Sequence, residues 1–231
     1  MYDLIIRGGT VLDGLGGDGY VADVGIKDGK IAAIGEDLSG SEYIDARGLT
    51  VTPGFIDSHS HSDGAVISYP DQREKVEQGI TYSITGQCGG SAAPSKNKET
   101  GEITTVSEFF EKIKDIPQGS GSSMLIGHNT LRKCVMGSEN RDPSAEELEV
   151  MKALLADGLR AGAMGMSFGL FYVPGSYAKE DELIALAKVV KEYNGIIAAH
   201  IRGEGNMLVE SVEEFLRVIV ASGCRAVFSH H

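Results

Sequence analysis

Apolar and polar positions divide the chain into two parts with different patterns. Up to about residue 50 the chain contains short runs rich in β-branched side chains, DLIIRGGTVLD, DVGIKDGKIAAIG and SEYIDARGLTV, separated by Gly-Gly, Asp-Gly and Gly-Lys turns. Such runs are typical of strands, and the KDGK segment at 27–30 indicates a hairpin. We therefore predict that residues 1–52 form the N-terminal portion of a small β-sandwich domain without candidate chemistry.

From residue 53 onward, apolar strands alternate with helices. The strand candidates are GFIDSH (54–59), TYSITGQC (81–88), SSMLIGH (122–128), GAMGMSF (162–168), GIIAAH (195–200) and CRAVFSH (224–230). Helical patterns lie between most of them, and the one over 142–162 begins with a capping box from Ser144 to Glu147. Near-continuous apolar strands between helices indicate a parallel sheet that is covered on both faces.

The spacing of these strands, about 25 to 40 residues for most, favours a barrel over a doubly wound sheet. We predict an α/β fold, a (β/α)8 TIM barrel over residues 53–231 that is partial because about six of its eight strands are present. The chain is expected to be the N-terminal part of a longer protein, since the last strand candidate has no helix after it. A dinucleotide-binding fold is not supported, because the glycines of GGTVLDG and GLGGDG precede no helix.

Charge and composition exclude several classes of partner. The 231 residues carry a net charge of −12, from 33 acidic and 21 basic side chains, without a basic cluster, so neither nucleic acid nor an anionic membrane is expected to bind. The N-terminus lacks the basic start and apolar run of a signal peptide, and no stretch approaches ~18 apolar residues. Cys88, Cys134 and Cys224 are odd in number and widely spaced, which argues against a disulfide framework and predicts a cytoplasmic protein. Cys134 and Cys224 are expected to pack in the core.

Side chains that can bind a metal recur at the C-terminal ends of the predicted strands. Five of the six strands carry one there: His59 and His61, Cys88, His128, His200, and His230. In a barrel this end of the strands carries the active site, and residues two apart on a strand face the same side. Imidazole nitrogen and thiolate sulfur together suit Zn²⁺ best, so the pattern predicts a zinc site.

Taken singly, each of these residues has a simpler interpretation. The His-Ser-His motif could be a polar turn, and Cys88 could be a small buried hydrophobic residue. His200, after the apolar GIIAA, could be a core histidine, and His230 beside His231 could belong to a tag. Recurrence at successive strand ends favours the metal site over these alternatives.

Several of these segments resemble a known family. TPGFIDSHSHSD resembles the first barrel strand of the amidohydrolase superfamily, and the opening DLIIRGGTVLDG to IDARGLTVTPGFID resembles the small β domain of that superfamily. TGQCGGSAAP, GHNTLR, GMSFGLFYVPGSYA, AAHIRGE and FSHH resemble the N-acyl-D-amino-acid deacylases, or D-aminoacylases. The resemblance covers essentially the whole chain. It implies a metal-dependent hydrolase that cleaves the small molecules N-acyl-D-amino acids to a D-amino acid and a carboxylate.

The resemblance also implies how the metal is bound. Cys88 takes the place of the carboxylated lysine of hydantoinases and dihydroorotases, and the fourth strand GAMGMSF indeed contains no lysine. In this subgroup Cys88, His200 and His230 bind one Zn²⁺ tightly, whereas His59 and His61 serve a second, weaker position. His231 is expected to flank the ligand.

Other residues receive supporting roles. Tyr172 and Arg202 follow strand ends and match substrate-binding positions of the family, with a solvated loop side chain as the alternative for each. His128 is expected to support a loop or line the pocket rather than to bind metal. Asp57 and Asp63 flank the histidine pair and could orient a histidine.

Amide hydrolysis also needs a proton acceptor for the attacking water and a proton donor for the amine. The resemblance implies one aspartate at the end of the eighth strand for both roles, and this aspartate lies beyond His231. No catalytic residue can therefore be named, and the chain alone is expected to be inactive.

Two alternative functions remain open. A cyclic-amide hydrolase of the hydantoinase or dihydroorotase type would use the same barrel, and a non-catalytic scaffold could also be built on it. Such scaffolds tend to lose metal ligands, whereas this sequence keeps the whole set. The amino-acid side chain, the acyl group and the oligomeric state are not predicted by the sequence.

Overall fold

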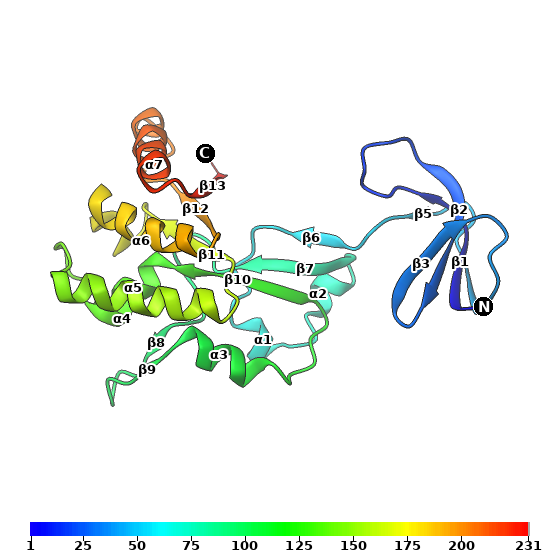
Figure 1. Ribbon diagram of the computed structural model, residues 1–231, viewed down its shortest axis with the longest axis horizontal. Coiled ribbons are helices and arrows are strands. Elements are labelled where there is room, and N and C mark those ends of the chain that lie inside the picture. The colour runs from blue at the N-terminus through cyan, green and yellow to red at the C-terminus, as the bar shows by residue number, and fades with distance from the viewer. Residues whose placement is uncertain (231) are drawn as a thin grey trace. The chain divides into compact units, whose positions relative to one another are not determined.

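The computed structural model describes residues 1–230, and the chain divides into two compact units, Met1–Phe55 and Ile56–His231 (Figure 1). His231, expected to flank the ligand, lies outside the described residues. Among the described helices, none has both the length and the apolar character needed to cross a membrane.

The first unit is a single five-stranded sheet. Its strands are β1 (Tyr2–Val11), β2 (Tyr20–Lys27), β3 (Lys30–Gly35), β4 (Gly40–Asp45) and β5 (Thr50–Val51). Their order is β3-β2-β1-β4, with β5 also paired to β1. The KDGK turn joins β2 to β3, and its Asp28 and Gly29 have the positive φ angles, 51° and 71°, that such a tight hairpin requires. A sandwich needs a second sheet, which these residues do not form, so the β-sandwich remains a prediction.

The second unit contains the predicted parallel sheet. Its strands are β6 (Phe55–Asp57), β7 (Ile80–Thr85), β10 (Gly121–Gly127), β11 (Gly165–Gly169), β12 (Ile196–His200) and β13 (Arg225–His230). They lie in chain order, β6-β7-β10-β11-β12-β13, and the pairs from β7 to β13 are parallel. This is the topology of part of a β/α barrel, with β6 and β13 as the edges of the described sheet. A small hairpin, β8 (Ser95–Lys96) and β9 (Ile103–Thr104), lies outside this sheet.

Helices follow the strands and cover one face of the sheet. They are α1 (Ala65–Ser68), α2 (Arg73–Val76), α3 (Val106–Ile113), α4 (His128–Val135), α5 (Ala145–Arg160), α6 (Glu180–Glu192), α7 (Leu208–Ser222) and the 3-10 turn η1 (Gly175–Tyr177). Figure 1 shows α5, α6 and α7 along the strands, and α6 contacts both α5 and α7. The predicted capping box of Ser144 and Glu147 begins α5, and Gly223, at φ 66°, ends α7.

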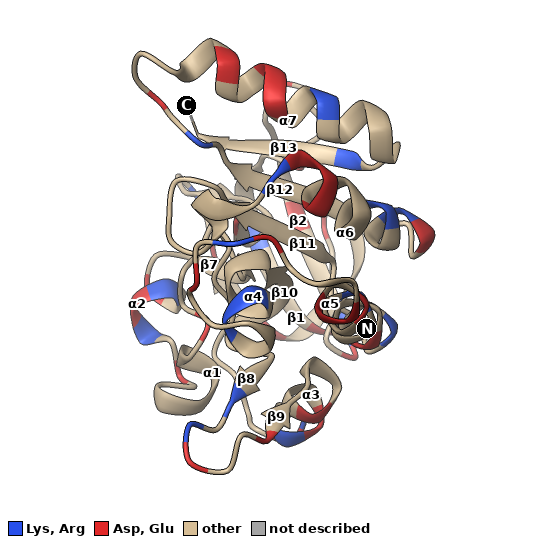
Figure 2. Ribbon diagram, turned by 90° about the vertical axis from the view of Figure 1, so that its left-hand side faces the viewer, with Lys and Arg blue, Asp and Glu red and all other residues tan. Residues whose placement is uncertain are grey.

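Charged side chains on these helices are mixed in sign. Figure 2 shows Lys and Arg beside Asp and Glu on α3, α6 and α7. Arg217 on α7, for example, pairs with Glu180 on α6 at 2.6 Å. This ion pair therefore links two neighbouring helices.

A charged cluster is buried between α4 and α6. His128 Nε2 lies 2.8 Å from Glu182 Oε1, and Arg132 Nη1 contacts the other carboxylate oxygen. The side chains of His128 and Arg132 are fully buried and that of Glu182 is 4% exposed. Burial raises the pKa of Glu182, but the hydrogen bond from His128 and the two neighbouring charges outweigh it and leave the pKa below its usual range. His128 therefore joins two helices and does not face the strand-end histidines described below.

Candidate metal centre

Side chains that could bind a metal, from four strands, converge at the C-terminal edge of the sheet. His59 and Cys88 follow β6 and β7, and His200 and His230 end β12 and β13. Cys88 Sγ lies 3.4 Å from His59 Nε2 and 3.9 Å from His230 Nε2. His230 Nε2 in turn contacts His200 Nδ1. His61 stands beside this group, with its ring centroid 5.3 Å from that of His59.

The spacing of these donor atoms suits a tetrahedral zinc ion. Zinc bonds of about 2.3 Å to sulfur and about 2.0 Å to nitrogen, at a tetrahedral angle, place the two donor atoms about 3.6 Å apart. The two sulfur-to-nitrogen distances of Cys88, 3.4 and 3.9 Å, bracket this value. The donor atoms of His59, Cys88 and His230 all lie within 4.8 Å of one another. The residues present therefore fit the predicted metal in both chemistry and spacing.

A second group of donors includes a glutamate that no sequence motif indicated. Glu204, with His200 and His230, offers ligand atoms within 4.8 Å of one another. Its Oε1 lies 3.4 Å from His200 Nε2, and its side chain is 41% exposed. The sequence signal that could have identified Glu204 is its position four residues after the strand-end His200. The two groups place Cys88 with His59 rather than with His200, so the predicted set of Cys88, His200 and His230 for the tight ion remains a prediction.

An irregularity in strand pairing brings His200 and His230 together. In the β12–β13 ladder Ala199 pairs with Phe228, but the next pair is His200 with His230, so Ser229 is an extra residue. With regular pairing, Ser229 would lie opposite His200. A bulge of this kind redirects a side chain, and here it sets two histidines side by side.

The turn that carries Cys88 is strained and tightly enclosed. Cys88 has φ 51°, in the left-handed region that few residues other than glycine adopt. Its neighbour Gly86 is also left-handed, and a Cβ there would lie 1.8 Å from the Leu125 carbonyl oxygen. A Cβ on Gly169 would lie 2.0 Å from the carbonyl oxygen of Cys88. The thiol is therefore aimed by a backbone that two neighbouring strands hold in place.

Ser167, a buried residue of β11, forms two hydrogen bonds to this turn. Its Oγ accepts a hydrogen bond from Gly89 N–H at 2.9 Å and donates one to the Gly86 carbonyl. Ser167→Ala leaves two buried backbone groups unpaired, at about 1–3 kcal/mol each. We expect Ser167→Ala to weaken zinc binding by about tenfold or more, because contacts behind metal ligands typically contribute 10- to 100-fold. Competition against a chromophoric chelator measures the dissociation constant.

Ser211 provides the matched control for that substitution. It is also a buried serine, 2% exposed, but its Oγ has no hydrogen-bond partner among the described residues. Ser211→Ala should leave zinc affinity at the wild-type value. Equal zinc affinities in the Ser167→Ala and Ser211→Ala proteins would show that Ser167 does not position Cys88.

Burial sets the protonation of the donors. It lowers the pKa of His59 and of His200, and the neighbouring imidazoles lower both further, so the rings are neutral near pH 7 and offer lone pairs. Burial raises the pKa of the Cys88 thiol to about 11, with an added contribution from the charge of Glu204. A thiol with this pKa keeps its proton in the metal-free protein, and coordination of a metal releases it.

Of the two predicted substrate contacts, Tyr172 lies next to the cluster. Its ring centroid is 4.8 Å from that of His200, and 44% of the residue is exposed. Asn129 Nδ2 donates to the carbonyl oxygens of Tyr172 and Gly169, which fixes the start of this loop. Tyr172 is therefore placed at the rim of the metal-binding group.

Arg202 is engaged elsewhere in the structure. Its guanidinium pairs with Glu214 on α7 at 2.8 Å and donates to the carbonyl oxygens of Ser176, at 2.7 Å, and Ala178, at 2.9 Å. These contacts fasten the 176–178 segment to α7. A direct substrate contact by Arg202 remains a prediction, and the geometry favours loop support.

The two aspartates beside the histidine pair differ from each other. Asp57 Oδ1 accepts a hydrogen bond from the backbone N–H of His59 at 3.3 Å, so it orients the loop rather than an imidazole ring. Asp63 Oδ1 is buried without a hydrogen-bond partner among the described residues, and burial raises its pKa. Lys75, which pairs with Asp57 at 2.9 Å, was not indicated by any sequence pattern.

Comparison with known proteins identifies relatives of the chain. The amidohydrolase family matches residues 42–230. The chain is 38% identical, over 99% of its length, to an N-acyl-D-aspartate deacylase of Alcaligenes xylosoxydans xylosoxydans, of which it covers 49%. It is 39% identical, over 99% of its length, to an N-acyl-D-glutamate deacylase of the same organism, of which it covers 50%. The chain thus spans about half the length of the curated relatives it matches.

Solved structures of deacylases also resemble this chain. A crystal structure of N-acyl-D-glutamate deacylase from Bordetella bronchiseptica, complexed with zinc and a phosphonate inhibitor, superposes with a TM-score of 0.93 at 38% identity, over all of this chain and 51% of that one. An L-hydantoinase from Arthrobacter aurescens reaches a TM-score of 0.68 at 21% identity over 98% of this chain and 52% of that one, which shows a shared fold alone. The resemblance to the D-aminoacylases is therefore confirmed, and the chain belongs to the amidohydrolase family.

Proposed function

We propose that the protein to which this chain contributes is a zinc-dependent hydrolase that converts N-acyl-D-amino acids to a D-amino acid and a carboxylate. The observation that carries this proposal is the cysteine in the donor group, Cys88, at 3.4 Å from His59 and 3.9 Å from His230. The deacylase relatives, similar over the whole of this chain, support the same chemistry.

Within the proposal, the residues of this chain bind and orient. Cys88, His200 and His230 hold one ion tightly, and His59 and His61 serve a second, weaker position. Zinc bound here would supply a water of pKa about 7 and polarisation of the amide carbonyl. The neutral histidines and the dissociable Cys88 thiol provide the ligands that such an ion needs.

Fewer contacts support the proposed roles of the residues that would face the substrate. Tyr172 would contact the acyl or amino-acid portion from the rim, and Arg202 would act through the loop it fastens. Asp57 is paired with Lys75, so it is not proposed as the catalytic base. That role is assigned to an aspartate outside this chain, and the 231-residue chain by itself is proposed to be inactive.

Location and partners follow from the same reasoning. All three cysteines are free, which agrees with a reducing compartment, and we propose the cytoplasm. The proposed partner is the small N-acyl amino acid substrate, without nucleic acid or membrane.

The proposal is tested by assaying the complete zinc-loaded protein on N-acetyl-D-methionine, N-acetyl-D-aspartate, N-acetyl-D-glutamate, the matching L-isomers and a hydantoin. We expect hydrolysis of at least one D-substrate, with kcat/KM exceeding that of its L-isomer by at least about tenfold. The three side chains compared in this way also identify the preferred amino acid.

Each of the alternatives has its own outcome in this assay. Ring opening of the hydantoin without deacylation would replace the proposal with a cyclic-amide hydrolase. Preferred hydrolysis of L-isomers would contradict the stereochemistry. A folded protein that binds no zinc and turns over no substrate would indicate a scaffold.

A further inference from the structure

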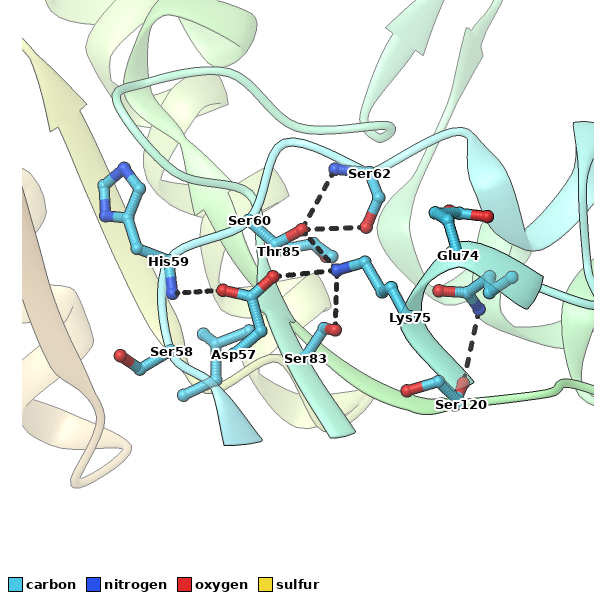
Figure 3. Close-up of polar contacts among 12 residues, drawn as sticks. Asp57, Ser58, His59, Ser60, Ser62, Glu74, Lys75, Ser83, Thr85 and Ser120 are labelled. Carbon is cyan, nitrogen blue, oxygen red and sulfur yellow. Dashed lines mark hydrogen bonds and ion pairs between the residues drawn. The ribbon is translucent and has the colours of Figure 1, made fainter. Parts of the chain in front are cut away.

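A buried lysine contacts the loop that carries His59 and His61. Lys75 lies on the short helix α2 and is only 8% exposed. Figure 3 shows its ammonium group between three acceptors: Asp57 Oδ2 at 2.9 Å, Ser60 Oγ at 2.8 Å and Ser83 Oγ at 2.8 Å. An ammonium group has three N–H donors, so its hydrogen-bonding capacity is fully used.

Two of these acceptors belong to the histidine loop. Asp57 accepts the backbone N–H of His59 through its other oxygen, at 3.3 Å (Figure 3). Ser60 lies between the two histidines, and its Oγ also accepts the backbone N–H of Ser62 at 3.3 Å. Lys75 thus contacts the residue two positions before His59 and the residue between the two histidines.

The third acceptor anchors the network to the sheet. Ser83 belongs to β7 and is fully buried. The backbone N–H of Ser60 also donates to the Ile84 carbonyl of β7 at 3.0 Å. The loop after β6 has little regular structure of its own, so these contacts determine where its side chains point.

The cost of burying the lysine is offset by the pairing with Asp57. The Lys75 ammonium group and the Asp57 carboxylate form an ion pair at 2.9 Å, with side chains 10% and 29% exposed. Removing one partner of a buried pair leaves the other charge uncompensated.

We propose that Lys75 is a positioning residue that fixes the loop geometry in which His59 and His61 bind metal. This inference rests on the proposed metal function. Cys88 is held instead by Ser167, and His200 and His230 by the β12–β13 register. Because Cys88 Sγ also lies 3.4 Å from His59 Nε2, loss of Lys75 should weaken both ions, and the ion that His59 and His61 bind more strongly than the other.

The test is metal binding by the complete protein in which Lys75→Met replaces the ammonium group with an apolar side chain of similar length. Zinc per chain is measured at fixed free zinc concentrations, and Co²⁺ titration follows the thiolate-to-cobalt absorption band that reports Cys88. We expect the affinity of the weaker ion to fall about 10- to 100-fold, the usual effect of contacts behind metal ligands, and the Cys88-reported affinity to fall by clearly less.

Two further variants keep this test decisive. Lys188→Met, at an exposed lysine of α6, controls for loss of a positive charge and should bind metal as the wild type does. Asp57→Asn preserves the size of the side chain and its acceptor for His59 N–H, and should show a smaller loss at the same ion. If circular dichroism shows that Lys75→Met does not fold, the metal affinities of Asp57→Asn test the inference instead.

Unchanged metal affinity in Lys75→Met would overturn the inference, and so would equal weakening of both ions, which indicates a general loss of structure. A wild-type protein that binds no metal would instead contradict the proposed function. The two failures are thereby distinguished.

Discussion

Cys88→Ala is expected to remove the tightly bound zinc while leaving the fold intact. Among residues 1–230 the hydrogen-bonding partners of the thiol are imidazoles, at 3.4 Å from His59 and 3.9 Å from His230, so its removal leaves no backbone group there unpaired. Contacts behind a metal ligand typically contribute 10- to 100-fold to metal affinity, so loss of the ligand itself should weaken zinc binding by more than about 100-fold. Zinc per chain after dialysis against a chelator, measured by mass spectrometry, and turnover of the D-substrate should both fall to background.

The other two cysteines are internal controls for this substitution. Cys134 and Cys224 are each 4% exposed, and their thiols donate to the carbonyl oxygens of Pro94 and Gly195. Cys134→Ala and Cys224→Ala should lower the free energy of unfolding slightly and retain zinc. Zinc retention by Cys88→Ala, or its loss in the two controls, would show that the metal is bound elsewhere.

The sequence predicted the barrel strands well because their signal is local. Each strand is an apolar run that ends near a polar or glycine residue, and all six appear within a few residues of the expected bounds. The capping box at Ser144 and the glycine stop at Gly223 likewise depend on neighbours within one turn. The four-residue helices α1 and α2 were not predicted, because so few residues show no periodicity.

The site was predicted in composition but not in geometry. Strand-end positions identified the histidines and Cys88, because parallel strands end at one edge of the sheet. The pairing of His200 with His230 depends on a bulge at Ser229, and such shifts leave no trace in a pattern of apolar residues. Lys75 was missed for a related reason, since its partners are set by tertiary contacts up to 18 residues away.

Arg202 is a residue for which the sequence suggested a contact that the structure does not show. An arginine just after a strand end resembles a substrate contact in sequence. In the structure, however, its guanidinium is used by Glu214 and two backbone carbonyls. Only the three-dimensional arrangement distinguishes an arginine that faces a ligand from one that fastens a loop.

Glu182→Gln is expected to destabilise the protein by about 3–5 kcal/mol, the usual cost of breaking a buried ion pair. The substitution leaves the fully buried Arg132 without its compensating charge and places an amide N–H₂ against either Arg132 or His128. Urea unfolding of the complete protein at pH 7, followed by circular dichroism, measures the loss. Glu180→Gln is the control, because Glu180 and its partner Arg217 are 36% and 54% exposed and such surface pairs contribute at most about 1 kcal/mol.

The same carboxylate makes a pH-dependent contribution whose sign follows from its lowered pKa. Because the pKa of Glu182 in the folded protein lies below its usual value, the carboxylate stabilises the fold at pH values above that usual value, about 4.3. This contribution is lost as the pH falls through the folded value. The free energy of unfolding of the wild type should therefore decrease below about pH 4.3 more steeply than that of Glu182→Gln, which has no proton to gain at this position. Parallel acid profiles for the two proteins would show that Glu182 is not held ionised by His128 and Arg132. A cost equal to that of Glu180→Gln would show that the contacts of Glu182 with His128 and Arg132 do not stabilise the fold.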